Sequence, residues 1–96
     1  MNKAVSEHEK VPLLLSKKQI DLIIEHTFAE DDLLDALWVS EVSGSRRIVL
    51  FTLHDLEDLN GHVAAAANHC KDKKLEDLLD TIYEAIQKAE QKYDLL

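Results

Sequence analysis

The stretch RIVLFTLHDLEDL, residues 47–59, decides the fold, because it joins a strand directly to a helix. Ile48–Phe51 is an apolar run without alternation, which is typical of a strand that is covered on both faces. Thr52 follows it, and its hydroxyl can accept a hydrogen bond from an early N–H of a helix. Leu56 and Leu59 then recur at helical spacing. The stretch therefore predicts a central strand followed by an amphipathic helix, the third helix of the chain.

The upstream stretch VPLLLSKKQIDLI, residues 11–23, has the same order of strand, hydroxyl residue and helix. Pro12 cannot donate to a β-ladder, so the strand Val11–Leu15 is expected at the edge of the sheet, beside the central strand. Ser16 and Gln19 have the spacing of a capping box, which predicts that the first helix starts there. The buried stripe of this helix is expected to contain Ile20, Ile23, Ile24, Thr27 and Phe28.

A second helix and a hairpin are predicted between these two stretches. Residues 30–32 are three acids, and negative charge is favourable at the positive end of a helix dipole. After this helix, residues 39–43 and 46–51 flank Gly44, which suits a type II′ hairpin turn and leaves open whether residues 39–43 form a third strand. The apolar side of the second helix is expected to contain Leu33, Leu34, Leu37 and Trp38.

The third and fourth helices are predicted to form an antiparallel hairpin. Asp72 can cap the fourth helix, which is expected to extend for about five turns. The short connection around Lys71 brings the two helices side by side. The apolar face of the third helix contains Leu56, Leu59, Val63, Ala67 and Cys70, and that of the fourth contains Leu75, Leu78, Leu79, Ile82, Ile86, Ala89 and Tyr93.

Together these elements predict an α+β fold, in which a small two- or three-stranded sheet packs against four helices. Residues 11–96 are expected to form a single globular domain, since a chain of 96 residues supports one core. Residues 1–10 are polar and aperiodic, so they are predicted to be a mobile polar tail.

Composition limits the classes of partner. The chain has 19 Asp and Glu against 11 Lys and Arg, a formal net charge of −8, which repels nucleic-acid phosphates and anionic lipid headgroups. No apolar run approaches the ~20 residues that a membrane-spanning helix needs. The charged N-terminus lacks the apolar core of a signal peptide, and the one cysteine agrees with a reducing compartment. We therefore expect a cytoplasmic protein that binds neither nucleic acid nor membranes.

Three side chains on the third helix form the candidate metal site. His54, Asp58 and His62 follow at i, i+4 and i+8, so they share one side of the helix, and two imidazoles with a carboxylate can hold zinc. This spacing is permissive, and solvated or carboxylate-paired histidines are favoured. His69 lies about 10 Å beyond His62, and Cys70 is on the apolar face, where a cysteine packs as a small hydrophobe. No Gly-rich phosphate loop, C-x-x-C or G-x-S-x-G occurs, so no cofactor is predicted and an enzyme is disfavoured.

The preferred hypothesis is a non-catalytic, cytoplasmic module that binds a protein partner or associates with itself. The alternative is a metal-binding protein or metalloenzyme that uses the helix face of His54, Asp58 and His62. Pro12 marks a sheet edge, whose unpaired backbone groups can be completed by a partner strand. Tyr83, Tyr93, Leu95 and Leu96 exceed what a small core covers and can anchor an interface. A homodimer through these surfaces is one form of this hypothesis, and like charges on the two copies would oppose it at low salt.

Two segments carry a resemblance. VAAAANHCKDKKLEDLLDTIYEAI, residues 63–86, and LSKKQIDLIIEHTF, residues 15–28, look like a recurring pattern in small uncharacterised bacterial proteins. The resemblance implies a compact domain of this kind. It implies no activity and no binding residues.

Overall fold

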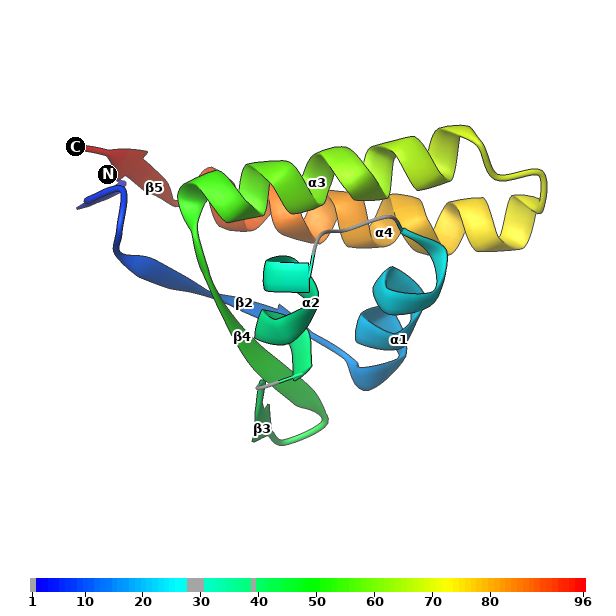
Figure 1. Cartoon of the computed structure of the whole chain (residues 1–96), viewed down its shortest axis with the longest axis horizontal. Coiled ribbons are helices and arrows are strands. Elements are labelled where there is room, and N and C mark those ends of the chain that lie inside the picture. The colour runs from blue at the N-terminus through cyan, green and yellow to red at the C-terminus, as the bar shows by residue number, and fades with distance from the viewer. Residues whose placement is uncertain (1, 28–30, 39) are drawn as a thin grey trace.

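The computed structural model describes residues 2–27, 31–38 and 40–96, apart from the side chains of Asp31 and Asp32. Its helices and strands confirm the predicted α+β class (Figure 1). In chain order the elements are β1 (Lys3–Val5), β2 (Lys10–Leu15), α1 (Lys17–His26), α2 (Asp31–Trp38), β3 (Glu41–Ser43), β4 (Arg46–Thr52), α3 (Leu53–Asn68), α4 (Lys73–Glu90) and β5 (Tyr93–Leu95).

The larger sheet has three antiparallel strands in the order β2-β4-β3. β4 is therefore the central strand and β2 an edge strand, as the run at 48–51 and Pro12 predict. The sequence left open whether residues 39–43 form a third strand, and the structure shows such a strand, β3, which pairs with β4 from Glu41 to Ser43. Val39 lies outside the described residues. Gly44 has φ of +62°, a left-handed conformation that favours glycine in the hairpin turn.

Only one face of this sheet is covered, so the prediction that β4 is buried on both faces is wrong. Val49 and Phe51 are buried, but the side chain between them, Leu50, is 51% exposed. In β2, Val11 and Leu13 are buried in the same alternating pattern. β4 contacts α2 and α3, and β2 contacts α4, so the helices supply the cover on the buried side.

The first helix starts at the predicted capping box. The Ser16 hydroxyl accepts a hydrogen bond from the Gln19 N–H at 3.1 Å, and the Gln19 side-chain oxygen accepts one from the Ser16 N–H at 2.9 Å. Ile20 and Ile23 of the predicted stripe are buried, and Phe28 lies outside the described residues. On α2 the prediction that Trp38 belongs to the buried apolar side is wrong. Trp38 is the last residue of the helix and is 70% exposed.

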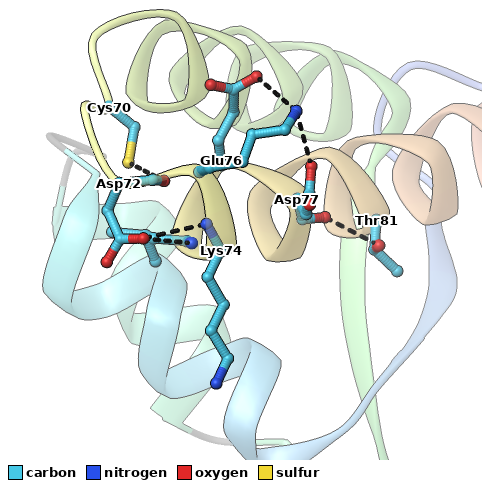
Figure 2. Close-up of polar contacts among 8 residues, drawn as sticks. Cys70, Asp72, Lys74, Glu76, Asp77 and Thr81 are labelled. Carbon is cyan, nitrogen blue, oxygen red and sulfur yellow. Dashed lines mark hydrogen bonds and ion pairs between the residues drawn. The ribbon is translucent and has the colours of Figure 1, made fainter.

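Helices α3 and α4 form the predicted antiparallel hairpin (Figure 1). The Thr52 hydroxyl accepts from the Asp55 N–H at 3.1 Å at the start of α3. Figure 2 shows the turn between the helices, where the Asp72 carboxylate accepts from the Lys74 N–H at 3.0 Å. Cys70 is half-buried in this turn, not packed on the α3 face, because α3 ends at Asn68; its thiol donates to the Asp72 carbonyl at 3.3 Å.

A second, two-stranded sheet joins the two ends of the chain. β1 pairs in parallel with β5, and Val5 in β1 is fully buried. The Leu96 N–H donates to the Val5 carbonyl at 2.9 Å, and both termini lie at the same end of the molecule (Figure 1). Residues 1–10, predicted to be a mobile polar tail, thus contain the strand β1. The sequence does not predict this strand, because it shows no periodicity around the single valine. Tyr93, predicted on the last helix, lies in β5 instead, since α4 ends at Glu90.

One core fills the space between the helices and the larger sheet, and Val5 of β1 belongs to it. Across the described ranges, every helix is too short or too polar to cross a membrane. The largest fully buried side chains are Phe51, Leu15, Ile23, Leu37, Leu56, Leu59, Leu79, Ile82 and Ile86.

Candidate interaction surface

The uncovered face of the three-stranded sheet is apolar. In the register of β2 and β4, Pro12 lies opposite Leu50 and Leu14 opposite Ile48, so these four side chains share one face. Leu14 is 47% exposed and Leu50 is 51% exposed. Pro12 is exposed as well, and Ile48 is half-buried. We call this cluster of Pro12, Leu14, Ile48 and Leu50 the outer sheet face.

A groove with a volume of about 400 Å³ runs between β2 and the C-terminal half of α4. Pro12, Leu14 and Ile48 of the outer sheet face line it on the strand side. Ala85 and Ala89 line it on the helix side, where their small side chains keep the wall low. We call this depression the β2–α4 groove.

The β2–α4 groove carries positive charge on an acidic protein. Arg46, Lys88 and Lys92 line it, and no Asp or Glu among the described residues does, although acids outnumber Lys and Arg by 19 to 11 in the chain. None of the three cations has an ion-pair partner among the residues that the structure describes. A hollow lined by one sign of charge concentrates the local potential, so this groove favours an anionic ligand.

A smaller hollow of about 190 Å³ adjoins the outer sheet face on the side of α2. Ile48 lines both hollows, and Leu50 lines the smaller one together with Ala36 of α2. The outer sheet face therefore lies between α4 and α2. Lys10 and Glu41 bring one charge of each sign to the smaller hollow, so its potential is balanced.

The predicted interaction residues do not form one surface. Pro12 and Tyr93 both line the β2–α4 groove. Leu95 and Leu96 are 59% and 84% exposed at the end of the chain. Tyr83 is half-buried against the core and lines a separate hollow between α3 and α4.

The candidate metal residues are not brought together. His54 Nε2 lies 3.7 Å from Asp58 Oδ2, and both side chains are mostly exposed. His62 is half-buried and lines a different cavity. The reason is geometric, because two helical turns place His62 about 12 Å beyond His54 along α3. Within the described ranges, no group of three or more His, Cys, Asp and Glu side chains could hold a metal ion.

His62 belongs instead to a mainly apolar cavity of about 290 Å³ where α1, α3 and α4 meet. His26, His69 and Cys70 also line it. The sequence predicts His62 and His69 about 10 Å apart along the third helix, and it has no signal that α1 would add His26. The remaining lining residues are Thr27, Ala65, Ala66, Leu75 and Leu79.

A further hollow, of about 570 Å³, is acidic. Glu57, Glu90 and Asp94 line it beside His54, and Glu7 lines it from the turn after β1. Burial raises the pKa of Glu90, and the negative charge of Glu57 raises it further. A Glu90 carboxylate oxygen has no hydrogen-bond partner among the described residues. This hollow therefore repels anions, and the charge of Glu57 disfavours ionisation of the Glu90 carboxyl.

Sequence reasoning missed most of the outer sheet face and its cations. Leu13, Leu14 and Leu15 are identical, so only the register with β4 tells which of them is exposed. A signal was present on α4, where Ala85, Lys88, Ala89 and Lys92 follow at i, i+3, i+4 and i+7. That spacing predicts two cations beside two small residues on one helix face; in the structure Lys88 lies on α4, and Lys92 lies in the turn that follows the helix.

Comparisons with protein-family models, with curated proteins and with solved structures found no match to this chain. The resemblance of residues 63–86 to small bacterial proteins stays a prediction.

Proposed function

We propose that the protein is a non-catalytic interaction module that docks a protein partner on its outer sheet face. The observation that carries the proposal is the pairing of Pro12 with Leu50 and of Leu14 with Ile48 on an uncovered sheet surface. Single exposed apolar residues are normal on a soluble protein, but a contiguous apolar cluster marks an interaction site. We also propose a cytoplasmic location, on the sequence features given above.

The chemistry of this face favours binding over catalysis. Its four side chains have no titratable or nucleophilic group, so all they can contribute is burial of apolar area. Full burial of a leucine contributes about 1.5–3 kcal/mol, and Leu14 and Leu50 are already about half covered. The two leucines would therefore add about 1.5–3 kcal/mol together on docking, below the roughly 4–15 kcal/mol that association costs. A partner must make further contacts beside this face.

The proposal is tested with a double variant, Leu14→Thr and Leu50→Thr, which retains β-propensity while removing the exposed leucines. Val42→Thr is the matched control, because Val42 is 71% exposed on β3 and pairs with Arg47, away from the outer sheet face. The full chain is immobilised and incubated with lysate of the source organism, and captured proteins are identified by mass spectrometry. We expect one specific partner that the wild type and Val42→Thr retain and the double variant loses.

Self-association is measured on the same three proteins by sedimentation at low and moderate salt. A dimer that the double variant loses would identify a second copy of the chain as the partner. A protein that stays monomeric and captures nothing, or captures the same proteins with and without the two leucines, overturns the proposal. Circular dichroism of each variant confirms that the fold is retained.

A further inference from the structure

We infer that the β2–α4 groove holds an acidic segment of the protein partner, with carboxylates beside Arg46, Lys88 and Lys92 and apolar side chains on the outer sheet face. This inference rests on the proposed function and names the chemistry of the partner. The groove and the outer sheet face share Pro12 and Leu14, so one segment can contact both.

Charge complementarity selects this occupant. Arg46 comes from β4, Lys88 from the end of α4 and Lys92 from the turn after it, and all three line one hollow that no acid in the described part of the chain lines. By contrast, Lys73 at the other end of α4 lies 3.2 Å from the Asp77 carboxylate and 3.7 Å from that of Glu76. The groove cations have no carboxylate partner among the described residues, which is also true of Lys17, Lys18 and Lys71; what distinguishes the groove cations is that they line one hollow together.

A structural role does not account for all three cations. Lys88 is in the last turn of α4 and Lys92 follows the helix end, so both can offset the negative end of the helix dipole. Arg46 is the first residue of β4 and has no such role, yet it lines the same groove. Because Arg46 lines the groove, the positive charge of the groove does not come from the end of α4 alone.

The shape of the groove suits an extended segment. Ala85 and Ala89 form a low wall, so a backbone can approach α4 between Lys88 on the helix and Lys92 in the turn after it. Apolar side chains at alternate positions of an extended segment would then contact Leu14 and Ile48. The acidic side chains between them would face the cations. Because these contacts are exposed, they should weaken as salt screens them.

The test uses the ¹⁵N-labelled full chain and two probes. The first is a short acetylated peptide in which glutamate and leucine alternate, and the second has glutamine in place of every glutamate. We expect the acidic peptide to shift the amide resonances of Leu14, Ile48 and Lys92. Its Kd should rise about fivefold between low and moderate salt, and the glutamine peptide should bind about tenfold more weakly.

Two charge variants with the same change in net charge separate the groove from general attraction. The groove variant combines Arg46→Gln, Lys88→Gln and Lys92→Gln, and we expect it to lose about tenfold in affinity for the acidic peptide. The control combines Lys17→Gln, Lys18→Gln and Lys71→Gln, three exposed lysines that do not line the groove. The control should bind the acidic peptide within about twofold of the wild type.

The inference is overturned if the two peptides bind equally, if the groove variant binds as well as the control, or if the shifted resonances lie elsewhere. Concentration-dependent shifts at Leu14 and Ile48 without peptide would show that a second copy occupies the groove, and would also overturn the named occupant. Partner capture distinguishes this failure from failure of the proposed function. If the Leu14→Thr, Leu50→Thr variant loses its partner and the groove variant does not, the interaction module stands and the acidic segment is rejected.

Discussion

Pro12 of β2 lies directly opposite Leu50 of β4, and both side chains are exposed on the face of the sheet that no helix covers. The next residue of β4, Phe51, points to the other face and is 1% exposed. Neighbouring residues of the same strand therefore belong to the exposed face, where we propose that a partner docks, and to the core. A change of register by one position would exchange the two roles.

This contrast predicts opposite outcomes for neighbouring substitutions. Phe51→Ala should lower the free energy of unfolding by about 3–5 kcal/mol, because it removes a fully buried aromatic side chain and leaves a cavity. Leu50→Thr should change it by less than about 1 kcal/mol, because the leucine is half exposed. Urea denaturation of both variants measures the two values. Similar losses at the two positions would contradict the assignment of the faces.

The helix starts were the part of the fold that sequence reasoning identified most directly. Ser16, Thr52 and Asp72 each accept a hydrogen bond from an early N–H of the helix that follows. Such caps depend on residue type and on spacing over three or four positions, so they can be recognised without any knowledge of tertiary contacts. The order of helices and strands follows from these starts and from the apolar stripes.

Ser16→Ala tests the best defined of these caps. The substitution removes the acceptor for the Gln19 N–H and should lower the free energy of unfolding by about 1 kcal/mol. Lys17→Ala is the matched control, because Lys17 is the exposed neighbour and makes no capping contact. Chemical denaturation of both variants gives the difference. An equal effect of the two changes would show that the capping box contributes nothing.

The rest of the fold depends on contacts between residues far apart in sequence. β1 is stabilised by β5, about ninety positions later, and nothing near Val5 signals that partner. The exposed face of β2 is set by its register with β4, and the leucines at 13–15 are chemically alike. The histidine cavity likewise needs α1 to approach α3. Local pattern therefore predicts the helices and the strands of the larger sheet, whereas β1, β5 and the surfaces depend on tertiary packing.

Val5→Ala distinguishes an anchored N-terminal segment from a mobile one. The side chain is fully buried and belongs to the core, so loss of two carbon atoms should lower the free energy of unfolding by about 2 kcal/mol. Lys3→Ala is the control, because it changes an exposed side chain of the same strand. Ala4→Gly would not be suitable, since it alters backbone entropy. A wild-type denaturation midpoint for Val5→Ala would support the mobile tail that the sequence predicts.

Glu90 should make the stability of the protein depend on pH. Burial raises the pKa of its carboxyl above the ordinary value of 4.5, and the nearby Glu57 charge adds to the increase. A raised pKa means that the folded state binds the proton more tightly than the unfolded state does. The stabilising contribution is therefore complete below about pH 4.5 and is lost as pH rises through the folded-state pKa. At neutral pH the charged Glu90 opposes folding.

Glu90→Gln should consequently raise the Tm at pH 7, because it removes this charge from the hollow that Glu57 and Asp94 also line. The difference from the wild type should shrink as pH falls through the folded-state pKa and should be smallest below pH 4.5, where the wild-type carboxyl becomes neutral in both states. Glu84→Gln is the control, since Glu84 is exposed on the same helix and lines no part of this hollow. Thermal melts of the three proteins from pH 4 to pH 8 measure the effect. A Tm difference that stays constant across this range, or that Glu84→Gln reproduces, would show that neither the burial of Glu90 nor its proximity to Glu57 controls the stability.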